Sequence, residues 1–202
     1  MKKIILIASL FLIYTFHALS NEPKLSEEIN GLRNPWSISF INDTKALITE
    51  KSGNLILVDF NSKKIQKIKH NLNILEDGQG GLLEVLYYRD EVFVSYTEER
   101  EKGNSSTSVA KARFNELELS FQNIFRAEPP INSGYHFGSR LVIKDNFIYI
   151  TAGERGEGMI AQDPKKHPGS IIRIHLDGRI PKDNPKFKDK KDWLQEIFQI
   201  GV

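Results

Sequence analysis

Three short segments of the chain combine side chains that could act on a ligand with glycines that permit sharp changes of direction. They are residues 77–83, residues 135–141, and residues 153–156 together with 161–163. His136 in the second segment directly precedes a run with strand character. An imidazole at the start of an inner strand is suited to act as a neutral general base near pH 7. The alternative is a structural histidine that packs beside Phe137 and bonds a backbone carbonyl.

Gln79 lies between glycines in the first segment. Its amide can donate hydrogen bonds to a sugar hydroxyl and accept them from it, and flanking glycines would let the backbone approach a ligand closely. The alternative is that these glycines are only turn residues. Arg140 in the second segment could bind an anion, although an Arg that begins a strand more often pairs with a neighbouring acid such as Glu154.

The composition excludes several classes of site and partner. The chain has 202 residues and no Cys, so it can form no disulfide, thiolate metal site or Cys nucleophile. The histidines His70, His167 and His175 show no metal-ligand spacing with acidic residues, and we predict no metal site built by this chain alone. The chain has 28 basic and 26 acidic residues, and the two numbers are equal when Lys2 and Lys3 are left out. This lack of net charge argues against nucleic acid as a partner.

The elements that must position these side chains are short strands separated by turns. Apolar runs recur in three groups of four, at a spacing of roughly 45 to 60 residues. This pattern predicts an all-β fold, a β-propeller of four-stranded antiparallel blades, of which the chain supplies about three. A β-sandwich is the main alternative, but it needs only about seven to nine strands, whereas about twelve are expected here. The expected strands are 36–40, 46–49, 55–60 and 65–68; 82–88, 92–97, 108–114 and 121–125; and 140–143, 147–152, 171–176 and 196–200.

Three connections are expected to lie on the surface. Residues 98–107 include Gly103 and Asn104 and predict an exposed hairpin loop. Residues 153–169 form a longer loop rich in Gly, charge and His, and loops of this length in compact domains are usually functional or disordered. The alternating lysines and aspartates of residues 181–193 predict a solvated surface.

The first twenty residues have the pattern of an export signal. Lys2 and Lys3 precede an apolar stretch over residues 4–16, and small residues occupy positions 18 and 20. We predict cleavage after Ser20 and a periplasmic or secreted protein without stable membrane insertion. An uncleaved membrane anchor is the alternative, but the apolar stretch is shorter than the ~20 residues that a spanning helix needs, and His17 interrupts it.

Six motifs follow one another along the chain: Gly31-Leu32-Arg33-Asn34-Pro35-Trp36, Gly78-Gln79-Gly80-Gly81-Leu82-Leu83, His136-Phe137-Gly138-Ser139-Arg140-Leu141, Gly153-Glu154-Arg155-Gly156, Ala161-Gln162-Asp163, and Leu176-Asp177-Gly178-Arg179-Ile180-Pro181-Lys182-Asp183-Asn184-Pro185. This ordered set closely resembles the soluble quinoprotein glucose dehydrogenase and aldose sugar dehydrogenase family. The resemblance covers residues 31–202. It implies a six-bladed propeller that binds pyrroloquinoline quinone (PQQ) and Ca²⁺ and oxidises the anomeric carbon of aldose sugars to lactones.

The resemblance also implies roles for three residues. The histidine of the His-Phe-Gly-Ser-Arg-Leu motif is the general base of the family and falls on His136. The glutamine of the Gly-Gln-Gly-Gly-Leu motif, which contacts the sugar oxygen at the reacting carbon, falls on Gln79. The glucose dehydrogenase branch has an Asp before the base, whereas this chain has Tyr135. This difference indicates the aldose sugar dehydrogenase branch and a substrate site with broad selectivity.

The resemblance further implies that residues 21–202 are the N-terminal part of such an enzyme. In the family, later blades supply the calcium ligands and the basic residues that hold the quinone, so these groups are expected beyond Val202. The chain alone is expected to be inactive, and to aggregate or form oligomers through unpaired sheet edges. The alternative is a non-catalytic or sugar-binding propeller segment that needs a partner or a C-terminal half.

Overall fold

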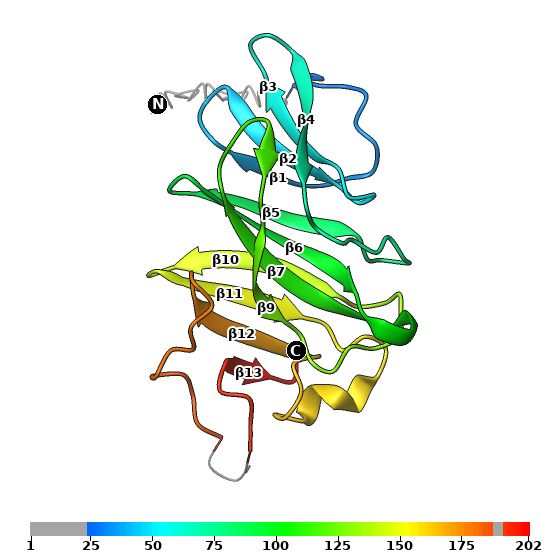
Figure 1. The fold of residues 1–202 in the computed structure, drawn as a ribbon, viewed down its shortest axis with the longest axis vertical. Coiled ribbons are helices and arrows are strands. Elements are labelled where there is room, and N and C mark those ends of the chain that lie inside the picture. The colour runs from blue at the N-terminus through cyan, green and yellow to red at the C-terminus, as the bar shows by residue number, and fades with distance from the viewer. Residues whose placement is uncertain (1–23, 188–191) are drawn as a thin grey trace, which may run out of the picture.

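The computed structural model describes residues 24–187 and 192–202 and has an all-β architecture, as predicted (Figure 1). The expected signal peptide, residues 1–20, lies outside the described residues. In the described ranges, no helix has the length and apolar character needed to cross a membrane.

Each of the three predicted groups of four strands forms an antiparallel meander, and all twelve expected strands are present. Several run one to three residues beyond the apolar runs that identified them. The first sheet contains β1 (Pro35–Phe40), β2 (Lys45–Glu50), β3 (Leu55–Asp59) and β4 (Lys64–His70); the second contains β5 (Leu82–Tyr88), β6 (Glu91–Glu99), β7 (Ser105–Arg113) and β9 (Gln122–Arg126); the third contains β10 (Gly138–Lys144), β11 (Phe147–Ala152), β12 (Ser170–His175) and β13 (Ile197–Ile200).

The three sheets follow one another face to face, in the manner of successive propeller blades (Figure 1). The first strand of the middle sheet, β5, lies against β1 of the sheet before it and β10 of the sheet after it. The turns that precede these first strands therefore come together at one end of the sheets, where two of the three chemistry-bearing segments are located.

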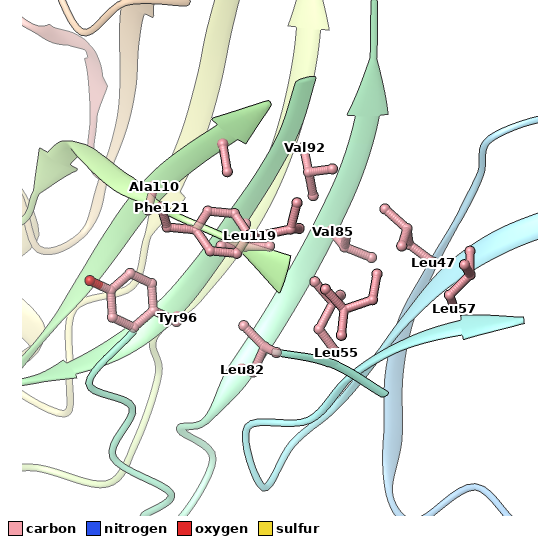
Figure 2. Close-up of a cluster of buried hydrophobic side chains, with 13 residues drawn as sticks. Leu47, Leu55, Leu57, Leu82, Val85, Val92, Tyr96, Ala110, Leu119 and Phe121 are labelled. Atoms are coloured by element: carbon pink, nitrogen blue, oxygen red, sulfur yellow. The ribbon is translucent and has the colours of Figure 1, made fainter. Parts of the chain in front are cut away.

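The middle sheet is buried on both of its faces. One cluster joins it to the first sheet and includes Leu47, Leu55 and Val92 (Figure 2), and the other joins it to the third sheet through Phe93 and Ile150. Neighbouring residues of β6 point into opposite clusters because side chains alternate along a strand. Each fully buried side chain of this size contributes about 1.5–3 kcal/mol to folding, so these two interfaces hold the sheets at a defined orientation.

A thirteenth strand, β8 (Glu118–Leu119), was not expected from the sequence. It belongs to the connection between β7 and β9 but pairs in parallel with β4 of the first sheet. Leu119 is buried in the cluster between the two sheets. A strand of two residues is too short to show an alternation of apolar and polar side chains, and its partner strand lies about fifty residues away in sequence. The sequence pattern therefore could not predict it.

The predicted exposed loop over residues 98–107 is wrong in its extent. Strands β6 and β7 remain paired as far as Glu99 and Ser105, with a short 3₁₀ turn, Glu101–Gly103, between them. Residues 105–107 are buried, and the Thr107 hydroxyl donates to the Phe137 carbonyl at 2.8 Å. Serine and threonine signal a turn by composition, but here the hydroxyls are engaged inside the protein. Those of Ser105 and Ser106 accept hydrogen bonds from Arg155 and Arg100, respectively.

Candidate functional site

Gln79 and His136, which are 57 residues apart in sequence, are in direct contact. The main-chain nitrogen of His136 donates to the side-chain oxygen of Gln79 at 2.9 Å. The main-chain nitrogen of Gln79 donates in turn to the Gly134 carbonyl at 2.7 Å. The turn before β5 and the turn before β10 are thus hydrogen-bonded to each other, which joins two of the three predicted segments into one site.

The glycines at this junction allow the protein to pack against itself. A Cβ atom on Gly78 would lie 2.4 Å from the Gly134 carbonyl oxygen, and one on Gly153 would lie 2.0 Å from the carbonyl oxygen of His136. No side chain fits at such distances. Since protein atoms occupy these positions, the lack of a side chain at Gly78 and Gly153 lets the neighbouring turns approach each other closely.

The imidazole of His136 is oriented by a carboxylate from the third segment. Its Nδ1 lies 2.5 and 2.8 Å from the two carboxylate oxygens of Glu154, which follows β11. The alternative that this histidine bonds a backbone carbonyl is therefore wrong. Since a carboxylate accepts hydrogen bonds, Nδ1 carries the proton in the neutral ring and Nε2 has a free lone pair. The His136 side chain is 54% exposed, and both ring hydrogen bonds found in the described residues are at Nδ1, which leaves Nε2 available to a ligand.

The charge of Glu154 is maintained by its surroundings. Partial burial by itself would raise the pKa of Glu154, but hydrogen bonds from His136 and from the Gly156 amide outweigh it and hold this pKa below the usual value. An ionised carboxylate on Nδ1 stabilises the charge that develops when Nε2 takes up a proton. The sequence places Glu154 in a motif but predicts it only as a partner for Arg140.

Tyr135 lies beside His136 on the protein surface. Its side chain is largely exposed, and its ring meets the His136 ring edge to face at a centroid distance of 6.3 Å. The three residues that were assigned to the site from the sequence, His136, Gln79 and Tyr135, are therefore adjacent in the structure.

Arg140 pairs with a different acid from the one expected. Its Nη1 donates to the Glu84 carboxylate at 2.7 Å, and the other oxygen of that carboxylate accepts from the Ser37 hydroxyl at 2.6 Å. Glu84 is buried on β5, between β1 and β10, and a buried carboxylate needs a paired cation. Glu84 therefore connects the first strands of all three sheets, while Glu154 is engaged by His136.

The cationic side chains around the site are already engaged by protein atoms. PQQ carries three carboxylates and needs cations to hold them. Lys51 donates to the Gly78 carbonyl, Arg140 pairs with Glu84, and Arg155 is buried. Lys51 and Arg155 are thus engaged within the protein, whereas Arg140 bonds Glu84 through Nη1 and its side chain remains 62% exposed. Among the residues described, no three His, Asp or Glu side chains gather where they could hold a metal ion.

Comparison with known proteins identifies the family of this chain. The model of the glucose/sorbosone dehydrogenase family matches residues 32–202. Aldose sugar dehydrogenase YliI of Escherichia coli (strain K12) is 32% identical over 182 residues, which are 85% of this chain and 48% of that protein. Quinoprotein glucose dehydrogenase B of Acinetobacter calcoaceticus is 25% identical over 209 residues, covering 86% of this chain and 43% of that protein.

Solved structures agree with the sequence comparison. A crystal structure of a glucose dehydrogenase superimposes with a TM-score of 0.81 at 32% identity, over 87% of this chain and 54% of the other. The apo form of the soluble aldose sugar dehydrogenase from Escherichia coli superimposes with a TM-score of 0.77 at 30% identity, over 82% of this chain and 50% of the other. The chain thus spans about half the length of the relatives that it matches. With most of its residues matched by the family model, the chain belongs to the glucose/sorbosone dehydrogenase family.

Proposed function

We propose that the protein containing this chain oxidises the anomeric carbon of aldose sugars to lactones, with PQQ as the oxidant. The observation that carries the proposal is the pairing of His136 with Glu154, which leaves Nε2 exposed beside Gln79 and Tyr135. Membership of a sugar dehydrogenase family supports the reaction class. The name of the Acinetobacter relative, a quinoprotein, supports PQQ.

The proposed role of His136 is to accept the proton of the anomeric hydroxyl. As the O–H bond breaks toward Nε2, the carbon–oxygen double bond of the lactone forms and the anomeric hydrogen leaves as hydride. PQQ, when bound, supplies the electrophilic centre that accepts such a hydride. Glu154 stabilises the imidazolium that results, because its carboxylate faces the protonated Nδ1.

The proposed role of Gln79 is to donate a hydrogen bond to the sugar. Its amide oxygen is engaged by the His136 main chain, so only its NH₂ group is available to a ligand. A donor beside the base holds the oxygen at the reacting carbon in line with Nε2. We include Ca²⁺ in the proposed function because the motifs resemble those of a family that binds this ion.

The proposal is tested with the whole product of the gene that encodes this chain, reconstituted with PQQ and Ca²⁺. Aldose-dependent reduction of a redox dye is expected. His136→Gln should lower kcat by at least ~10², because general-base catalysis contributes ~10² to 10⁴. The control is His175→Gln, which removes an imidazole that stacks on Phe147 in the third sheet and should leave kcat unchanged. Near-normal turnover of the His136 variant would assign the base elsewhere.

A non-catalytic, sugar-binding segment is the second candidate, and the exposed ring of Tyr135 beside the Gln79 amide favours it, because these groups could bind a sugar without a redox step. Aldose binding without dye reduction by the whole gene product would establish this second function. We further propose export by the signal over residues 1–20, for which the mature protein should begin at Asn21 by N-terminal sequencing.

A further inference from the structure

Arg155 is a buried cation directly beside the candidate site. It follows Glu154 in the chain, but its side chain lies beneath the turn that carries His136 and is 3% exposed. No Asp or Glu of the described residues forms an ion pair with it. A buried Arg without a carboxylate partner must satisfy its N–H groups elsewhere, since an unpartnered buried charge is strongly destabilising.

The guanidinium of Arg155 bonds the backbone on the N-terminal side of His136. Its Nε donates to the Tyr135 carbonyl at 2.9 Å, and its Nη2 donates to the Ser133 carbonyl. The remaining bonds tie this turn to β7, because Nη1 and Nη2 donate to the carbonyl and the hydroxyl of Ser105, each at 3.0 Å.

The same guanidinium also contacts the residue on the C-terminal side of His136. Its central carbon lies 3.7 Å from the ring centroid of Phe137, a buried side chain, in a cation–π arrangement. Burial lowers the pKa of Arg155 to about 10, against the opposing effect of Asp77 and Glu154, so the group still carries its charge at neutral pH.

The backbone of His136 needs such support. Its φ of 48° lies in the left-handed region, which residues with a side chain rarely adopt and which persists only where surrounding contacts impose it. Arg155 restrains the residue before and the residue after His136, while Glu154 restrains the ring. The dipeptide Glu154-Arg155 therefore holds both the side chain and the main chain of one histidine.

We propose that Arg155 is a positioning residue that keeps His136 in its left-handed conformation, with Nδ1 on Glu154 and Nε2 open to the substrate. The catalytic consequence rests on the proposed function, whereas the positioning itself is a property of this chain without sugar or cofactor. Lysine cannot replace arginine here. The planar guanidinium bonds four acceptors and stacks on the Phe137 ring, whereas a single ammonium group cannot do both.

The test compares Arg155→Lys with a matched control in the third sheet. Arg173 is also a buried Arg stacked on a Phe, with its guanidinium carbon 3.9 Å from the Phe147 ring, and it contacts none of the site residues. The whole product of the gene that encodes this chain is labelled with ¹⁵N, without sugar or cofactor, and the His136 amide signal and ring-nitrogen shifts are recorded by NMR. Arg155→Lys should move the His136 amide signal and shift its ring nitrogens toward tautomer-averaged values, whereas Arg173→Lys should leave both unchanged.

Unchanged His136 signals in a folded Arg155→Lys variant would overturn the proposal. Equal shifts in both variants would also overturn it, because they would indicate a general loss of structure. If Arg155→Lys does not fold, Ser105→Ala is used instead, since it removes one acceptor of the same guanidinium. This variant should shift the His136 signals in the same direction by a smaller amount, and no shift would count against the proposal.

Activity supplies a second readout that separates the two proposals. In the whole gene product, Arg155→Ala should lower kcat by at least ~10-fold, and added guanidinium ion should restore part of the loss. Altered NMR signals in a protein that oxidises no sugar would leave the positioning intact and contradict only the proposed function. An active enzyme whose kcat does not change in Arg155→Ala would contradict the positioning role.

Discussion

The side-chain oxygen of Gln79 accepts a hydrogen bond from the main-chain nitrogen of His136 at 2.9 Å. A main-chain N–H can only donate, so the amide of Gln79 must present its oxygen to it and its NH₂ group to the opposite side. A side chain from the turn before one sheet thereby supports the backbone of the candidate base before the next sheet.

Two substitutions of Gln79 separate its two hydrogen-bonding roles. Gln79→Glu retains an oxygen for the His136 amide but removes the donor, whereas Gln79→Ala removes both. Gln79→Glu should lower kcat/KM for an aldose by roughly 10-fold, the value of one lost hydrogen bond, and Gln79→Ala should lower it by more because it loses both roles. Only Gln79→Ala should also displace the NMR signal of the His136 amide. A displaced signal in Gln79→Glu would show that the amide oxygen is not the supporting group.

Replacing Glu154 by Gln should impair turnover more than sugar binding. The amide keeps a group near Nδ1 but cannot stabilise a protonated imidazole by charge, so kcat should fall by at least ~10-fold while KM changes little. Because the pKa of Glu154 is held below its usual value, its contribution should persist as the pH is lowered and disappear only below about pH 4.5. Steady-state kinetics across pH measures both effects.

The control for Glu154 is Glu157→Gln, which alters an exposed carboxylate three residues away that forms no ion pair in the described structure. Its kcat should equal that of the unmodified protein. An equal loss in both variants would attribute the effect to the loop and not to the carboxylate on His136.

Tyr135 should give the enzyme broad selectivity among aldoses. Its exposed phenol can stack on a sugar face but lacks the charge with which an Asp would bind particular hydroxyls. Values of kcat/KM for glucose, galactose, xylose and a disaccharide should therefore be comparable, and Tyr135→Asp should spread them. A preference for glucose above ~10³ in the unmodified protein would contradict this interpretation.

Glu196 should make the stability of the third sheet depend on pH. The hydrogen bond from His167 lowers the pKa of Glu196 from its ordinary value of 4.5, against the effect of burial. A lowered folded-state pKa adds stability that is complete above the unfolded value and lost as the pH falls through the folded value. The difference in unfolding free energy between the unmodified chain and Glu196→Gln should therefore shrink below about pH 4.5 in urea titrations. A difference that is constant with pH would refute the linkage.

The sequence by itself determined the strands and much of the site. Apolar runs and turn residues predicted all twelve blade strands because the alternation of side chains along a strand is a local property. The sequence also predicted that His136, Gln79 and Tyr135 belong together, through motifs whose order resembles a known family. It did not predict β8, which is too short to show a periodicity, or the burial of residues 105–107, where the Thr107 hydroxyl bonds the Phe137 carbonyl 30 residues away.

Only the tertiary structure decided which charged groups face one another. Arg140 was expected to pair with Glu154, 14 residues away, but pairs with Glu84, 56 residues away on the adjacent inner strand. Glu154 is instead free to orient His136, and the next residue, Arg155, is buried beneath the same turn. Such pairings depend on how one sheet packs against the next through two apolar clusters. A local pattern contains no information on distances between sheets, so the partners of these side chains could not be deduced from the chain alone.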